Sequence, residues 1–229
     1  MLNKVLQPAN QFHGMPTAHL VGSFSKGLDT GILEKVASSS SLLKQAREIK
    51  PEKGYSFVHL ITTGAGERYS CNNNGDYFNK EARTVEFPNP KHGVSKFRML
   101  DGGLKKYHPT FTKYAHVYRE HNNSRKGASP LGDVVLESYN DAMDRGELIA
   151  KMPDKEWGAE LHKLANEKPV FFSMGAGVSH DICSECGNEA KVSADYCDHV
   201  KYDKMKMTKE GNQIFMYNEN PHFHDISGV

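Results

Sequence analysis

Three cysteines and one histidine lie within a span of seventeen residues, with the spacing Cys-x2-Cys-x10-Cys-x-His. They are Cys183, Cys186, Cys197 and His199. Thiolates and imidazole are ligands that zinc prefers, and four of them complete a closed structural site. Gly187 follows the second cysteine and permits the tight backbone turn that a metal knuckle needs. The spacing therefore predicts a zinc knuckle inserted at about residues 178–211.

Other interpretations of this cluster stay open. His180 competes with His199 for the fourth ligand position. Buried or free thiols, or a redox Cys-x-x-Cys pair, are further alternatives, but a redox pair is expected to open a helix after a strand. Here Gly-Asn follows, and a third cysteine is close by. We favour zinc, and we expect the isolated Cys71 to be a plain thiol.

The charge balance limits the partners that this chain can have. Among its 229 residues, 29 are Lys or Arg and 28 are Asp or Glu, which gives a net charge of +1. That balance provides no electrostatic case for a nucleic-acid or membrane-surface partner. No apolar stretch approaches the length of a membrane span, and the first residues lack the apolar core of a signal peptide. We expect a soluble intracellular protein.

The expected elements are mostly strands. We expect an irregular arm at residues 1–30, helical residues at 31–50 that the serine run 38–41 interrupts, and loops at 88–113. A helix capped by Asp154 is expected to carry Trp157, Leu161 and Leu164 on one apolar face. Strands are expected at 56–62, 133–139, 146–152, 170–173, 213–217 and 223–227, and a turn at 72–77. This order predicts a barrel-like α+β domain at 55–229, after an N-terminal arm and helical segment at 1–54.

Ser173 is a candidate nucleophile. It ends the expected strand at 170–173 and precedes Met-Gly-Ala-Gly, whose glycines would let backbone N–H groups approach an oxyanion. A serine needs a base to activate it, and His121 and its rival His116 lie upstream.

The order of several motifs resembles the prohead (capsid-maturation) serine proteases of large tailed bacteriophages, which are related in fold to herpesvirus assemblin. The resemblance covers roughly residues 55–229. Its motifs are Asn-Gly-Asp-Tyr at 74–77, Leu-Gly-Asp-Val at 131–134 after a histidine, Phe-Phe-Ser-Met-Gly at 171–175, the cysteine cluster, and Phe-His-Asp-Ile-Ser at 223–227. It implies an assemblin-like β-barrel core with surrounding helices.

The resemblance also implies a catalytic triad. Ser173 would be the nucleophile and His121 the general base. Asp225 would be the third member, at a position where the family more often has Glu, and Gly228 interrupts the apolar run of that strand. His199 is a rival for the third position, in a Ser-His-His arrangement, and His222 and His224 flank Asp225. Period-2 alternation is expected to place Phe223, Asp225 and Ser227 on one face, opposite Ile226.

The implied function is endopeptidase cleavage of scaffold (core) and capsid proteins inside the immature phage head, in the host cytoplasm. Self-association of the chain is left open. The competing hypothesis is a catalytically inactive, zinc-stabilised virion or scaffold-binding protein on the same fold. A zinc-knuckle nucleic-acid binder is disfavoured because the chain lacks a basic, aromatic-rich patch.

Overall fold

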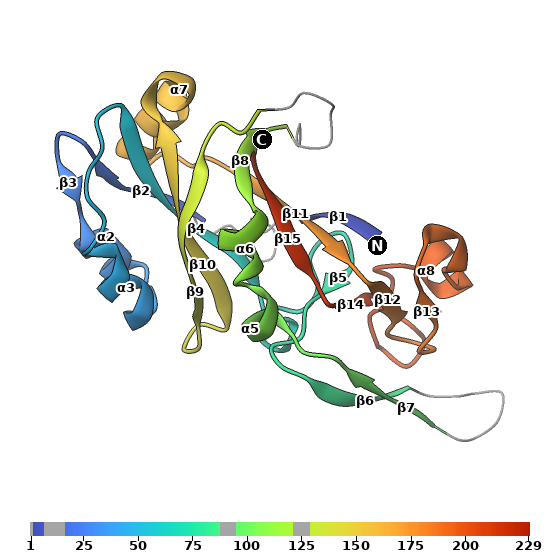
Figure 1. The fold of residues 1–229 in the computed structure, drawn as a ribbon. Coiled ribbons are helices and arrows are strands. Elements are labelled where there is room, and N and C mark those ends of the chain that lie inside the picture. Colours follow the sequence, from blue (N-terminus) through green and yellow to red (C-terminus); the bar gives the residue numbers. More distant parts are fainter. Residues whose placement is uncertain (1, 7–16, 88–94, 121–128) are drawn as a thin grey trace.

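The computed structural model describes residues 2–6, 17–87, 95–120 and 129–229. Its main element is a nine-stranded sheet with the strand order β1-β11-β15-β8-β9-β10-β4-β2-β3 (Figure 1). These strands are β1 (Leu2–Leu6), β2 (Ala18–Ser23), β3 (Gly27–Leu28), β4 (Tyr55–Gly64), β8 (His116–Arg119), β9 (Asp133–Asn140), β10 (Arg145–Pro153), β11 (Phe172–Val178) and β15 (His222–Gly228).

Two smaller sheets extend this body. A four-stranded sheet has the order β13-β12-β14-β5, with β5 (Asp76–Tyr77), β12 (His180–Cys183), β13 (Glu189–Ala190) and β14 (Met216–Glu219). A two-stranded ribbon, β6 (Arg83–Phe87) with β7 (Lys96–Leu100), projects away from the rest of the chain (Figure 1). The expected knuckle insertion therefore continues directly from β11 into a separate sheet.

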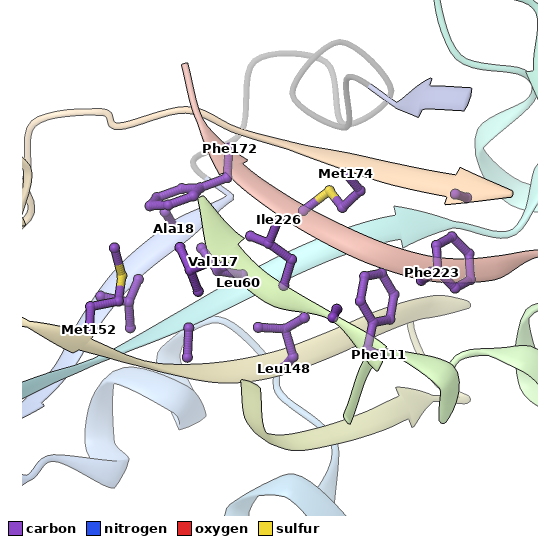
Figure 2. Packing of buried hydrophobic residues seen from close by; sticks show 14 of the residues in the cluster. Ala18, Leu60, Phe111, Val117, Leu148, Met152, Phe172, Met174, Phe223 and Ile226 are labelled. Carbon is purple, nitrogen blue, oxygen red and sulfur yellow. The ribbon is translucent and has the colours of Figure 1, made fainter. Parts of the chain in front are cut away.

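The main sheet curls without closing, so the expected β-barrel is wrong. In the part of the chain that the structure describes, β1 and β3 are the two ends of the strand order and do not pair with each other. The curl nevertheless brings β11 near β4, and the inner face of the sheet packs on itself (Figure 2). The buried core includes Leu60, Val117, Leu148, Phe172, Met174, Phe223 and Ile226. The fold is therefore α+β with an open, curled sheet.

Helices cover both faces of this sheet. Helix α7 (Asp154–Ala165) buries Trp157, Leu161 and Leu164 in the inner core, which confirms the expected apolar stripe. On the outer face, α2 (Thr30–Lys35) and α3 (Ser40–Ala46) cover a second core. Val36–Ser39 separates them, so the expected interruption is confirmed at Ser38 and Ser39, whereas Ser40 and Ser41 begin α3. Among the described residues, none of the helices is long and apolar enough to cross a membrane.

The cap of α7 differs from the expectation. Pro153 occupies the N-cap position, and Asp154 is the first helical residue. The Asp154 carboxylate accepts a hydrogen bond of 2.7 Å from the Ser56 hydroxyl on β4. Asp154 therefore still lies where a negative charge stabilises a helix N-terminus, while its side chain ties α7 to the sheet.

Two other expectations are wrong. The described parts of residues 1–30 form β1, β2 and β3 instead of an irregular arm. The described parts of 88–113 contain β7, α5 (Leu104–Tyr107) and α6 (Thr110–Tyr114) instead of loops. These short elements depend on tertiary packing; Phe111 of α6, for example, stacks on Phe223 of β15 with ring centroids 4.4 Å apart. Packing of this kind overrides weak local propensity.

Gly228 provides a test of this packing. A Cβ at this position would lie 2.6 Å from the Trp157 ring, so Gly228→Ala must displace the buried indole. We expect a loss of about 1–3 kcal/mol in the free energy of unfolding, measured in urea. Gly158→Ala on the exposed side of α7 is the control, because nothing lies within 4 Å of its new Cβ. It should raise stability by about 0.5–1 kcal/mol. Equal effects of the two variants would contradict this account.

Candidate functional site

The four predicted ligands come together in one cluster. Cys183 ends β12, Cys186 lies in the following turn, Cys197 precedes α8 (Asp198–Tyr202) and His199 lies in the first turn of that helix. Their ligand atoms all lie within 4.8 Å of one another. The Cys186 and Cys197 sulfurs are 3.6 Å apart, and Sγ of Cys197 is 3.9 Å from Nδ1 of His199. Tetrahedral bonds of about 2.0–2.3 Å separate ligands by roughly 3.3–3.8 Å, so the cluster could hold a metal ion and its spacing fits zinc.

The structure distinguishes between the two candidate histidines. His199 belongs to the cluster, whereas the His180 Nδ1 lies 2.9 Å from the Ser179 hydroxyl and is not part of it. Gly187 has a φ of +63°, which confirms the predicted tight turn after the second cysteine. The same glycine packs against Phe87, which a Cβ would approach to within 3.0 Å. The knuckle is thus shaped for four protein ligands and for contact with the β6–β7 ribbon.

Contacts within the cluster shift the pKa values of its thiols. A hydrogen bond with Cys183, followed by contacts with His199 and Cys197, holds the pKa of the Cys186 thiol well below its ordinary value. The same bond, together with burial, raises the pKa of Cys183. A thiolate is thus already favoured at Cys186, and it would attract a cation. Cys71 lies outside this cluster, and burial raises the pKa of its thiol.

Ser173 lies near the start of β11, and the expectation that the strand ends there is wrong. β11 begins at Phe172, and Ser173 is 2% exposed. The Met-Gly-Ala-Gly segment continues the strand; Gly175 pairs with Asp225 of β15 on one side and with Val5 of β1 on the other. These glycines therefore belong to the sheet ladder instead of to an open oxyanion-binding loop.

Asp225 lies on the neighbouring strand, with its carboxylate on the same face as Ser173. The register pairs Ser173 with Ser227 and Gly175 with Asp225. The Ser227 hydroxyl donates to both Asp225 oxygens, at 2.9 and 3.2 Å. A Cβ on Gly175 would lie 2.8 Å from the Asp225 Cβ, so this glycine makes room for the carboxylate beside the serine.

The expected alternation along β15 is wrong at one position. The pairing with β11 shifts between Gly175 and Ala176, which leaves His224 as an extra residue in β15. Because of this bulge, Phe223 joins Ile226 in the core, while Asp225 and Ser227 share the opposite face. Phe223 and Asp225 are therefore not on one face, although Asp225 and Ser227 are.

The candidate histidines differ in where they lie relative to Asp225. His121 lies outside the described residues. The strand before it in the chain, β8, ends at Arg119 and pairs in parallel with β15, with His116 opposite Asp225. The His116 Nδ1 lies 2.9 Å from an oxygen of Asp133 and is exposed. The ring of His224 instead contacts its own strand, at 3.2 Å from the His222 carbonyl.

Asp225 also acts electrostatically on β8. The pKa of Tyr118 is raised by burial and then by the negative charges of Asp225 and Asp133. Tyr118 is paired with Ser227. The polar face thus spans three neighbouring strands, β11, β15 and β8, with the Asp225 carboxylate in the middle.

Two of the polar clusters among the described residues were missed by the sequence analysis. The Ser38 hydroxyl lies 3.3 Å from the Nε2 of His59, which is fully buried with a pKa lowered by burial and by its neighbours His19 and Arg145. A second group, here called the Lys4 cluster, joins distant segments and consists of Lys4, Asn72, Asp76, Asp181, Tyr196 and Asn218. No local pattern predicts either cluster, because their members meet only through the fold.

The metal assignment can be tested with paired cysteine variants. We expect wild-type protein to contain one metal ion per chain by elemental analysis, and Cys186→Ser to lose it. The free energy of unfolding should fall by about 3 kcal/mol or more, since binding to the folded state adds to stability. Cys71→Ser, outside the cluster, should keep the metal. Wild-type protein without stoichiometric metal, or with a Cys183–Cys186 disulfide, would contradict the assignment.

Comparison with known proteins does not identify this site. No protein-family profile, no curated protein and no solved structure matches the chain. The structural features that bear on its chemistry are therefore the Ser173–Asp225 face and the cluster of Cys183, Cys186, Cys197 and His199.

Proposed function

We propose that the chain is a serine endopeptidase that cleaves scaffold (core) and capsid proteins inside the immature head of a tailed bacteriophage. The carrying observation is that Ser173 and Asp225 lie on one face of adjacent strands, with Gly175 leaving room for the carboxylate. The resemblance in motif order supports the substrate class.

The proposed mechanism assigns one role to each triad member. His121, which follows β8 in the chain, accepts the proton of the Ser173 hydroxyl as the oxygen attacks the scissile carbonyl. Asp225 holds the imidazole in the required tautomer and stabilises its charged form. His121 then protonates the leaving amine, and water hydrolyses the acyl-enzyme. Because Gly175 and Gly177 lie in the sheet ladder, we assign the oxyanion donors to other N–H groups.

The metal has a structural role in this proposal. Zinc held by Cys183, Cys186, Cys197 and His199 would have all four positions filled by protein, which leaves no position for a substrate or a reactive water. His199 would then be committed to the metal and could not orient His121. A metal-bound His199 therefore favours Asp225 as the third triad member.

A second candidate function is supported by burial. Ser173 and Asp225 are only 2% and 1% exposed, whereas a nucleophile must be reached by its substrate. This favours the catalytically inactive, zinc-stabilised virion or scaffold-binding protein. The two proposals differ in one property, which is the reactivity of the Ser173 hydroxyl.

Ser173→Ala should abolish cleavage of a co-expressed scaffold protein and leave the melting temperature near that of the wild type. The reason is that the alanine lacks the attacking oxygen while the strand is preserved. A fluorophosphonate probe, followed by mass spectrometry, should label wild-type protein at Ser173.

Ser38→Ala is the control, because the Ser38 hydroxyl lies 3.3 Å from a histidine ring nitrogen, Nε2 of His59, but is not part of the Ser173–Asp225 face. It should retain both cleavage and labelling. Wild-type cleavage by Ser173→Ala would remove Ser173 as the nucleophile. Absence of labelling and cleavage in the wild type would favour the inactive protein.

Asp225→Asn should keep the geometry of the site but favour the wrong imidazole tautomer. In a well-studied triad this change lowers turnover by about 10⁴-fold, and we expect a loss of that order in cleavage rate. The comparison is His199→Cys, which replaces one metal ligand by another and should retain both metal and activity. Near-normal activity of Asp225→Asn together with an inactive, metal-loaded His199→Cys would make the second histidine the third member.

The identity of the base is tested in the same assay. His121→Ala should lose cleavage as completely as Ser173→Ala. His116→Ala should retain it, because the His116 ring is exposed and already bonded to Asp133. The reverse result would assign the base to His116, whose strand position is paired with Asp225.

A further inference from the structure

The Lys4 cluster is a buried polar group that the proposed mechanism does not use. The Lys4 ammonium lies 2.7 Å from Asp181 and 3.0 Å from Asp76, and all three side chains are at least nine-tenths buried. Asn218 donates to Asp181 at 2.8 Å, and Tyr196 donates to the same carboxylate at 2.6 Å. The cluster thus joins β1 to β5, β12, β14 and the segment that leads into Cys197.

The two negative charges of the cluster, on Asp76 and Asp181, require the positive charge of Lys4. Burial alone would lower the pKa of Lys4, but the attraction of Asp76 and Asp181 outweighs burial and raises that pKa above its ordinary value. Two buried carboxylates would face each other if this cation left. Removing one partner of a buried ion pair is strongly destabilising, because the remaining charge keeps its desolvation cost. The buried carboxylates of Asp76 and Asp181 therefore stabilise the arrangement in which β1 lies beside β11 and supplies Lys4.

The same residues adjoin the metal ligands. Asp181 is two residues before Cys183, and Tyr196 directly precedes Cys197. The apolar cluster inside the knuckle is small; its buried members are Cys183, Val200 and Met216, with Cys186, Tyr196 and Cys197 packed against them. A segment with so small a core depends on a metal or another cross-link to stay folded. Loss of the metal would therefore free Tyr196 and loosen Asp181.

We propose that the metal-bound knuckle anchors the N-terminal strand, through Tyr196 and Asp181, to the edge of the strand that carries Ser173. β1 pairs with β11 from Leu2 opposite Val178 to Leu6 opposite Met174, one residue from Ser173. Without the anchor, β1 leaves this edge, and the N–H and C=O groups of β11 that pair with it are bared to solvent. Tyr196 and Asp181 are thus positioning residues for that edge.

Hydrogen exchange measured by mass spectrometry tests this anchor in the full chain. The experiment uses Ser173→Ala protein, so proteolysis cannot affect the result. The inference rests on the metal site of the proposed function but not on its protease activity, so failure of one is distinguishable from failure of the other. Chelation of the metal, and separately Tyr196→Phe, should accelerate exchange at residues 2–6 and 174–178 by roughly tenfold or more. Loss of a hydrogen bond to a charged group produces a change of this order. Exchange in β9 and β10 should stay unchanged.

Tyr202→Phe is the matched control, because Tyr202 lies in the knuckle helix α8 but is 70% exposed. It should leave exchange at residues 2–6 at the wild-type rate. Lys4→Met should accelerate exchange at residues 2–6 while the metal stays bound, since it removes the ammonium that joins β1 to Asp76 and Asp181 and leaves the metal ligands in place. Unchanged exchange at residues 2–6 after chelation would overturn the proposal, whatever the variants do. Equal acceleration by Tyr196→Phe and Tyr202→Phe would also overturn it.

Discussion

Burial of one apolar cluster inside the curled sheet is the constraint on which the other features depend. Val117, Phe172, Met174, Phe223 and Ile226 come from three neighbouring strands and face inward together (Figure 2). Side chains alternate along a strand, so fixing this inner face also fixes which residues lie on the outer face. Ser173 faces outward because its neighbours in sequence are needed in the core.

The bulge in β15 adjusts this rule at the candidate site. Strict alternation would place Asp225 with Phe223, and a buried aromatic and a carboxylate would then compete for one environment. The extra residue, His224, lets Phe223 and Ile226 both reach the core while Asp225 and Ser227 stay beside Ser173. β-Bulges commonly redirect side chains beside functional sites, and this one directs Asp225 and Ser227 to the face that carries Ser173.

Sequence patterns predicted the parts of the molecule that local chemistry determines. The Cys-x2-Cys turn with Gly187, the Trp157 stripe of α7 and the strands β9 and β10 all follow from spacing and periodicity. The open sheet could not be predicted, because closure depends on whether strands distant in sequence meet. The role of Lys4 was missed for the same reason: the partners of this lysine lie 72 and 177 residues further along the chain.

The place of β15 in the sheet has a consequence for folding during synthesis. β15 follows both β11 and β8 in the chain, yet it lies between them, and neither of these strands pairs with the other in the described sheet. As the ribosome extends the chain, β8–β10, β4 and β2 can assemble early, whereas β11 has no hydrogen-bonded partner among these strands and can join them only after β15 emerges. Contacts this distant in sequence fold slowly, and the inner apolar face stays accessible to chaperones during that interval.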